Sequence, residues 1–490
     1  MTIRKVVPRR GGMARNMVHL GIGQVTTTIL TIVLNAVMAR TLGPLEFGEL
    51  YLVITIATFS YVVVDWGYGM LITRETARHS GRAGELMGSA FAVRSASVLV
   101  ACVVAVSITW LLKYDVRTRV LAGALILGWL PQYFGLSFGW VFRARERMDL
   151  DALLNVVLKT ATVVGSLAVL ALTRNLLVLM SVWSVAGCLT LTMGIAMYRR
   201  QHLPALTANR STMRELVRDG APFFAVNLAV ALETYLNVNI LYKMASPEVV
   251  GWLGAAANIF GTLIAPAGIF VGTMYPRLSV AATDEAEFKR AFHVALRPLL
   301  LLAVLGAVGT YLFADVAVGL IYGLEKFGPA ADDLRAFAPA LMLMYLGMFL
   351  SCAAVAKGNA GWLAIAKGTS VALTTGLVFL LVHICQERFG NGGLSVPFAM
   401  MMGESLMLVS GIVLVRGSIA GGMILDLFRG LLAGAATIGV VRLLPNLTPF
   451  LAIPMCVLIF GVLAWVVGAV KRSDFESLLL SFRKRTPLTG

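Results

Sequence analysis

Long apolar runs recur along the whole chain, and they constrain its fold more than any other feature. Each run holds about 20 residues, enough for a helix to cross a hydrocarbon core of about 30 Å. Of the 490 residues, 58% are hydrophobic and only 13% are charged. A run of this length crosses a bilayer as a helix, because a helix satisfies its own backbone hydrogen bonds. The sequence therefore predicts an all-α polytopic membrane protein. We predict fourteen spans, at 16–39, 49–72, 86–112, 120–142, 151–172, 176–198, 221–242, 249–275, 291–313, 334–355, 368–385, 394–415, 430–444 and 449–470.

Lys and Arg are distributed very unevenly between the predicted loops. With a cytoplasmic N-terminus, 28 of the 41 Lys and Arg lie in inner segments and 8 in outer loops. This asymmetry follows the positive-inside rule and predicts a multi-pass protein with both termini in the cytoplasm. The net charge of +16 is then mostly a consequence of this topology, and it would attract anionic lipids of the inner leaflet. Nucleic acid is not an expected partner, because the charge is scattered over many short loops.

The second half of the chain repeats the first with an offset of 203 residues. Residues that correspond include Arg40 with Lys243, Pro44 with Pro247, Gly48 with Gly251, Gln24 with Asn227, and Thr31 with Thr234. Six spans separate the copies, so the sequence predicts two six-helix lobes in parallel repeat plus two extra C-terminal helices. The predicted segments are a basic cytoplasmic N-terminus 1–15, an N-terminal lobe 16–198, an interlobe loop 199–220, a C-terminal lobe 221–415, two additional helices 416–470, and a basic cytoplasmic tail 471–490.

Polar side chains share one face of the first helix in each lobe. Because a polar group that faces lipid is costly, these stripes predict either a wet cavity or hydrogen bonds to a partner helix. The residues are Gln24, Thr28, Thr31 and Asn35 in the first lobe, and Asn227, Thr234 and Asn237 in the second.

Three cations lie in the inner half of the predicted membrane. Arg94, Lys159 and Arg297 are each about six to eight residues into a span. Such a group would bind an anion from the cytoplasmic leaflet, and the planar fork of Arg suits phosphate. The alternative is that each side chain snorkels to the headgroups. Asp65 is expected to pair with Arg94 or Lys159, with ion coupling as its alternative role.

Two carboxyl groups, on Glu233 and Glu404, are predicted near the midplane of the membrane. A carboxylic acid at this depth can bind and release a proton or hold Na⁺, or can be a protonated hydrogen-bond partner. We therefore expect coupling to H⁺ or Na⁺, and no resident cofactor or metal. The chain has no G-x-x-x-x-G-K-[ST] or H-E-x-x-H motif, and its loops are short, so we expect a secondary transporter and not an ATPase or other enzyme.

The motif-like part of the chain is its first hairpin, residues 30–78. It contains ARTLGPLEFGELY at 39–51 and DWGYG at 65–69, and the second lobe opens with GAPFF at 220–224. In these motifs, in span number and in lobe layout, the chain resembles the polysaccharide branch of the multidrug/oligosaccharidyl-lipid/polysaccharide exporter superfamily, which includes O-antigen and exopolysaccharide flippases.

The resemblance implies an alternating-access flippase in the bacterial inner membrane. Its substrate would be an undecaprenyl-pyrophosphate-linked oligosaccharide, moved to the periplasmic leaflet for polysaccharide biosynthesis. It also implies a cationic cavity between the lobes, a role that Arg94, Lys159 and Arg297 would fill. Expected partners are membrane lipids and the polymerase and glycosyltransferases of the pathway, with the protein a monomer. The alternatives are a peptidoglycan lipid-precursor flippase, a drug or cation antiporter, a polytopic glycosyltransferase or ligase, and a non-transporting scaffold.

Overall fold

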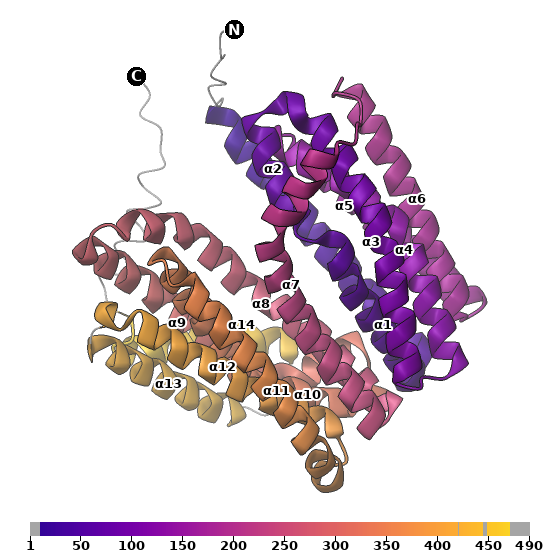
Figure 1. Ribbon diagram of the computed structural model, residues 1–490. Coiled ribbons are helices and arrows are strands. Elements are labelled where there is room, and N and C mark those ends of the chain that lie inside the picture. Colours follow the sequence, from indigo (N-terminus) through magenta and orange to yellow (C-terminus); the bar gives the residue numbers. More distant parts are fainter. Residues whose placement is uncertain (1–9, 420, 444–447, 471–490) are drawn as a thin grey trace. The chain divides into compact units, whose positions relative to one another are not determined.

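Helices form almost all of the computed structural model, which describes residues 10–419, 421–443 and 448–470. The predicted basic ends 1–9 and 471–490 lie outside these residues. The helices divide between two compact units, Met1–Gly251 and Trp252–Gly490. In the first unit they are α1 (Arg10–Asp65), α2 (Tyr68–Arg78), η1 (Ser80–Arg82), α3 (Ala83–Leu111), α4 (Val116–Ala144), α5 (Met148–Leu172), α6 (Leu176–Arg200) and α7 (Arg210–Met244), drawn from indigo to magenta in Figure 1.

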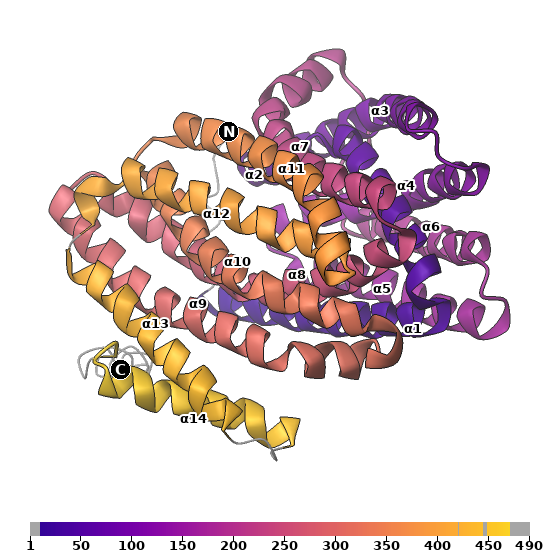
Figure 2. The same ribbon diagram turned by 90° about the horizontal axis from the view of Figure 1, so that it is seen from below.

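The second unit holds the rest of the chain, together with two helices that follow the repeat. Helix α8 starts at Pro247, within the first unit, and continues into the second. Figure 2 shows α13 and α14 lying side by side, and buried side chains of both pack against α9. The elements are α8 (Pro247–Ala281), α9 (Glu285–Ile321), α10 (Leu324–Ala356), α11 (Ala360–Phe389), η2 (Gly392–Leu394), α12 (Ser395–Leu414), η3 (Arg416–Ser418), α13 (Gly421–Arg442) and α14 (Pro449–Val466).

Every predicted span has a helical counterpart in the described residues. Twelve helices there are long and apolar enough to cross a membrane, and α7 also qualifies when its two parts, bent by 47°, are taken together. One of the twelve, Gly21–Arg78, runs from α1 into α2. It contains a break at Gly43 and therefore holds two of the predicted spans. The prediction of an all-α polytopic fold with about fourteen spans is confirmed.

Helix α13 is longer than the short span predicted for it at 430–444. It begins at Gly421, so its added turns include Asp426, which the sequence assigns to a loop. Its Oδ1 lies 3.0 Å from Nη2 of Arg297 on α9. An ion pair of this kind lets a charged residue lie within a span.

The two turns that mark the sequence repeat contact each other, and they do so reciprocally. Gly48 lies against the carbonyl oxygen of Pro247, and Gly251 lies against the carbonyl oxygen of Pro44. Each proline is the first residue of a helical arm, after Gly43 (φ 76°) in α1 and at the start of α8. Corresponding residues of the repeat thus occupy corresponding positions in one contact. A side chain at either glycine would overlap backbone atoms, so close approach requires glycine at both positions.

Helix α7 opens the second repeat in sequence but packs with the first unit. Its residues contact α1 and α3. The ring of Tyr235 stacks on Phe59 of α1 with centroids 4.6 Å apart, and Asn239 accepts a hydrogen bond from the hydroxyl of Tyr114. The lobe limits 16–198 and 221–415 stay a prediction, since compactness divides the chain at 251.

Candidate functional site

A cavity of about 680 Å³ lies inside the first unit, between α1, α3, α4 and α5. It brings together four residues that the sequence singled out on four separate predicted spans: Gln24, Asp65, Arg94 and Lys159. The complete lining is Gly23, Gln24, Thr27, Thr58, Asp65, Arg94, Trp129, Gln132, Tyr133, Leu136, Ser137, Trp140, Arg143, Asp151, Ala152, Asn155, Leu158 and Lys159.

Arg94 is held in the cavity wall by hydrogen bonds from both terminal nitrogens and by one aromatic ring, while its buried Nε has no hydrogen-bond partner among the described residues. Its side chain is only 1% exposed, and Nη2 donates to Oδ1 of Asp65 at 2.5 Å. Nη1 donates to the carbonyl oxygen of Tyr133 at 2.9 Å and to the hydroxyl of Ser137. The guanidinium also lies 4.6 Å from the ring centroid of Trp140, a cation–π distance. The predicted pairing of Asp65 with Arg94 is therefore present, and the charge of Arg94 is already compensated.

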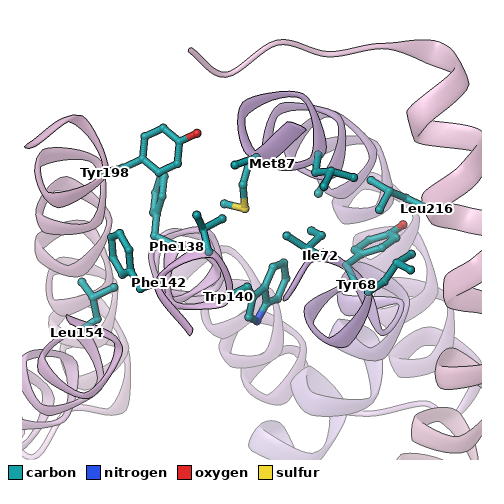
Figure 3. Close-up of a cluster of buried hydrophobic side chains, with 14 residues drawn as sticks. Tyr68, Ile72, Met87, Phe138, Trp140, Phe142, Leu154, Tyr198 and Leu216 are labelled. Atoms are coloured by element: carbon teal, nitrogen blue, oxygen red, sulfur yellow. The ribbon is translucent and has the colours of Figure 1, made fainter. Parts of the chain in front are cut away.

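A buried apolar cluster supports this wall. Figure 3 shows Phe138 and Phe142 of α4 next to Tyr198 and Leu154, with Trp140 directed toward Ile72. Because these side chains come from α2 to α7, the position of Arg94 depends on most of the unit. A cation enclosed in this way cannot snorkel to the membrane surface, so the snorkelling alternative does not describe Arg94.

Lys159 differs from Arg94 in having no polar partner in the part of the chain that the structure describes. It is half-buried in the cavity wall, and its ammonium makes no hydrogen bond or ion pair with the part of the chain that the structure describes. The side-chain amides of Gln24 and Gln132 line the same cavity, and they too have no hydrogen-bond partner in the described ranges. A cation and two amides thus present unused hydrogen-bonding groups to one cavity in a membrane-spanning bundle.

Sequence reasoning missed the polar residues on α4 and on the first turns of α5. Arg143, assigned to a loop, places Nε 3.4 Å from Oδ2 of the buried Asp151. Asn155 donates from Nδ2 to the carbonyl oxygen of Asp151 at 2.9 Å. Asp151, Asn155 and Lys159 are spaced by four residues, a one-face pattern that could have predicted this part of the site.

The remaining predicted residues lie elsewhere. Thr28, Thr31 and Asn35 are half-buried on α1 but do not line this cavity, and the hydroxyl of Thr31 donates to the carbonyl oxygen of Thr27. On α7, Asn227 and Thr234 are exposed, Glu233 is half-buried, and Asn237 is buried.

In the second unit, two predicted residues are largely buried but lie on different helices. Arg297 pairs with Asp426, and the side chain of Glu404 on α12 is 7% exposed.

The amino-acid sequence also matches a family of known proteins. The family described as "Polysaccharide biosynthesis protein" matches residues 13–281, which is more than half of the chain and includes all of the cavity residues. The chain belongs to this polysaccharide biosynthesis family. The resemblance inferred from the first hairpin is confirmed for the family. No curated protein matches the chain significantly.

Solved structures with the same fold cover most of this family member. "Lipid II flippase MurJ, inward closed conformation" is 13% identical and has a TM-score of 0.73, over 93% of this chain and 99% of that one. An inward-facing multidrug resistance MATE family transporter of the MOP superfamily is 15% identical, with a TM-score of 0.64 over 87% and 99%. The MATE multidrug transporter DinF-BH is 14% identical, with a TM-score of 0.57 over 85% and 97%. At these identities the likeness shows the fold alone.

The DWGYG motif of the polysaccharide biosynthesis family member forms a break that ties α7 to the cavity. Between α1 and α2, Trp66 (φ 43°) and Gly67 (φ 75°) adopt left-handed backbone conformations. Trp66 donates from Nε1 to the carbonyl oxygen of Val217 at 2.9 Å and stacks on Phe224, with ring centroids 4.0 Å apart. Because Trp66 directly follows Asp65, one break both supplies the partner of Arg94 and anchors the first turns of α7.

We expect Trp66→Ala to loosen the first turns of α7. The half-buried indole loses its stacking and one hydrogen bond, together about 2 kcal/mol, so local opening should become about tenfold or more frequent. Tryptic cleavage after Arg214 and Arg218 in the detergent-solubilised protein measures this opening. Trp66→Phe retains the ring and should show a smaller increase, whereas an unchanged cleavage rate in Trp66→Ala would show that this contact does not anchor α7.

Proposed function

We propose that this protein is an alternating-access flippase that moves undecaprenyl-pyrophosphate-linked oligosaccharide repeat units for polysaccharide biosynthesis. The proposed direction is from the cytoplasmic to the periplasmic leaflet of the bacterial inner membrane, with both termini in the cytoplasm. The family match and the shared fold of known transporters support transport over catalysis.

The observation that carries the proposal is the ammonium of Lys159, which lies in a cavity inside a membrane-spanning bundle and has no partner among the described residues. A cation with no partner among the described residues is costly at this position, and an anionic group of a ligand would compensate it. Gln24 and Gln132 offer amide groups to sugar hydroxyls, and the aromatic side chains of Trp129 and Tyr133 line the same cavity. We therefore propose that Lys159 contacts the anionic part of the substrate, and that Arg94 shapes the cavity wall.

An uncompensated cation argues against a drug or cation antiporter, because like charges repel strongly where water is excluded. The fold likeness to a lipid II flippase keeps a peptidoglycan lipid-precursor flippase as the second candidate. Complementation separates the two candidates, since each substrate has its own flippase-null strain.

Coupling to H⁺ or Na⁺ is part of the proposal. Among the three predicted carboxyl groups, that of Glu404 is the most buried. It lies next to Gly347 of α10. Asp65 is engaged with Arg94 and is the poorer candidate. The polymerase and glycosyltransferases of the pathway are the proposed partners, and the protein is proposed to act as a monomer.

We expect Lys159→Gln to reduce export of repeat units by about tenfold to thirtyfold, because one charge-assisted contact of about 2 kcal/mol is lost. Complementation of a strain that lacks its own flippase, with lipid-linked intermediates assayed on both leaflets, measures the effect. Lys159→Arg should retain most activity, and Lys289→Gln, which removes an exposed cation on α9, should retain all of it. Full export by Lys159→Gln would remove Lys159 from the substrate path.

A further inference from the structure

The first turns of α7 have a buried side and a strongly basic exposed side. Thr212, Leu216 and Gly220, spaced by four residues, are buried, and Leu216 belongs to the apolar cluster of Figure 3. The opposite side carries exposed Arg210, Arg214 and Arg218 with the same spacing. These arginines, with Ser211 and Glu215, line a hollow of about 550 Å³, here named the arginine groove.

The charges of the arginine groove are not balanced. Arg210 and Arg214 have no hydrogen-bond or ion-pair partner within the residues that the structure covers. Oε2 of Glu215 lies 3.1 Å from Nη2 of Arg82, so that carboxylate is already engaged. Arg218 pairs with Asp219 at 2.7 Å. The groove therefore keeps at least two uncompensated guanidinium groups on successive helical turns.

The exposed side of α7 changes from basic to apolar along the chain. Val217, 36% exposed, and Ala221, also exposed, continue the face that carries the arginines. From residue 221 the sequence predicts a membrane span, so we expect the arginines at the level of the headgroups on the predicted cytoplasmic side. A surface that is cationic at the headgroup and apolar below it is complementary to an anionic lipid, and a soluble anion would leave the apolar part uncovered.

We propose that the arginine groove docks the pyrophosphate headgroup of a prenyl lipid before the lipid enters the transport path. The inference rests on the proposed function, and it adds a docking surface outside the cavity. Guanidinium groups donate paired hydrogen bonds to phosphate oxygens, and arginines one helical turn apart, about 6 Å, can grip the two phosphates together. The same turns of α7 are anchored beside Asp65 through Trp66, so the docked headgroup lies on the segment that borders the cavity wall.

Binding of geranylgeranyl pyrophosphate to the full-length protein in phosphatidylcholine nanodiscs, at physiological salt, tests the proposal. We expect R210Q/R214Q to weaken binding about tenfold, since two charge-assisted contacts are lost from an exposed site. The matched control is R199Q/R200Q, which removes two exposed arginines from the end of α6. The control should bind within about twofold of the unmodified protein.

Three results would overturn the proposal. Equal weakening in both double variants would show only general attraction to a basic surface. Competition by cardiolipin as effective as that by the pyrophosphate would show a site for anionic phospholipid in general. Absence of probe binding to the unmodified protein would remove the site altogether. Complementation of a flippase-null strain tests the proposed function separately. If the unmodified protein restores export but R210Q/R214Q binds the probe normally, the docking proposal is wrong and the proposed function stands.

Discussion

Arg94→Gln should lower the free energy of unfolding by about 3 kcal/mol, one of the two largest effects we expect in this protein. Removal of one partner from a buried pair costs about 3–5 kcal/mol, and the lower end applies because Asp65 is 38% exposed. The variant also loses the donors to Tyr133 and Ser137 and the contact with Trp140. Denaturant titration or thermal unfolding of the detergent-solubilised protein measures the change.

The double variant Asp65→Asn/Arg94→Gln isolates the ion pair from the other contacts. Asp65→Asn alone leaves the guanidinium buried without its counter-ion and should also destabilise the protein. The double variant should be less destabilised than the sum of the single variants, with a coupling of about 1–3 kcal/mol. Strict additivity would mean that Asp65 and Arg94 do not stabilise each other, which is incompatible with the observed pair.

Gly48→Ala should destabilise the protein by about 2–3 kcal/mol, against the usual trend for a helix. Alanine in place of glycine normally stabilises a helix by about 1 kcal/mol. At this position the added Cβ would overlap the carbonyl oxygen of Pro247, which is backbone and cannot rotate away. The α1 arm and the start of α8 must then separate, at the cost typical of overpacking. Unfolding in detergent, together with the yield of monodisperse protein, reports the effect.

Two further variants make this prediction specific. Gly251→Ala should behave like Gly48→Ala, because its Cβ would overlap the carbonyl oxygen of Pro44 in the reciprocal contact. Gly123→Ala on α4 is the control, since nothing lies within 4 Å of its added methyl group, and it should be neutral or stabilising. A stability gain in Gly48→Ala similar to that in Gly123→Ala would show that the two turns are not in contact.

The site divides its cations between two roles that their residue types alone do not distinguish. Arg94 and Lys159 are both basic residues at a similar depth in predicted spans. Arg94 is enclosed by a carboxylate, a carbonyl oxygen, a hydroxyl and an aromatic ring, so its replacement is expected to affect folding first. Lys159 has no such partners in the described residues, so its replacement is expected to affect substrate handling first.

Much of the fold could be predicted because the signals for it are local. A run of about 20 apolar residues must be helical wherever it lies, and the fourteen spans correspond to helices for this reason. The missed turns of α13 show the limit. Asp426 interrupts the apolar run in the sequence, and its pairing with Arg297 of α9 is visible only in the tertiary structure.

Less of the site could be predicted. Depth along a span placed Asp65, Arg94 and Lys159 in one layer of the membrane, and all three line the cavity of the first unit. Arg297 satisfied the same depth criterion in the C-terminal lobe, and the structure adds that it pairs with Asp426 in the second unit. The contributions of Gln132, Arg143 and Asp151 depend on which faces of α4 and α5 pack together, and hydropathy carries no information on that choice.

The sequence by itself determined the helical class, the number of spans, the repeat and the family, because each follows from composition and order along the chain. Only the tertiary structure decided which polar groups are compensated. The pairing of Asp65 with Arg94 and the mutual contact of Gly48 and Gly251 join residues 29 and 203 positions apart, while Lys159 is left without a partner among the described residues. The physical reason is that desolvation and pairing depend on how whole helices pack against each other. The identity of a polar residue in the sequence does not show whether the fold provides it with a partner.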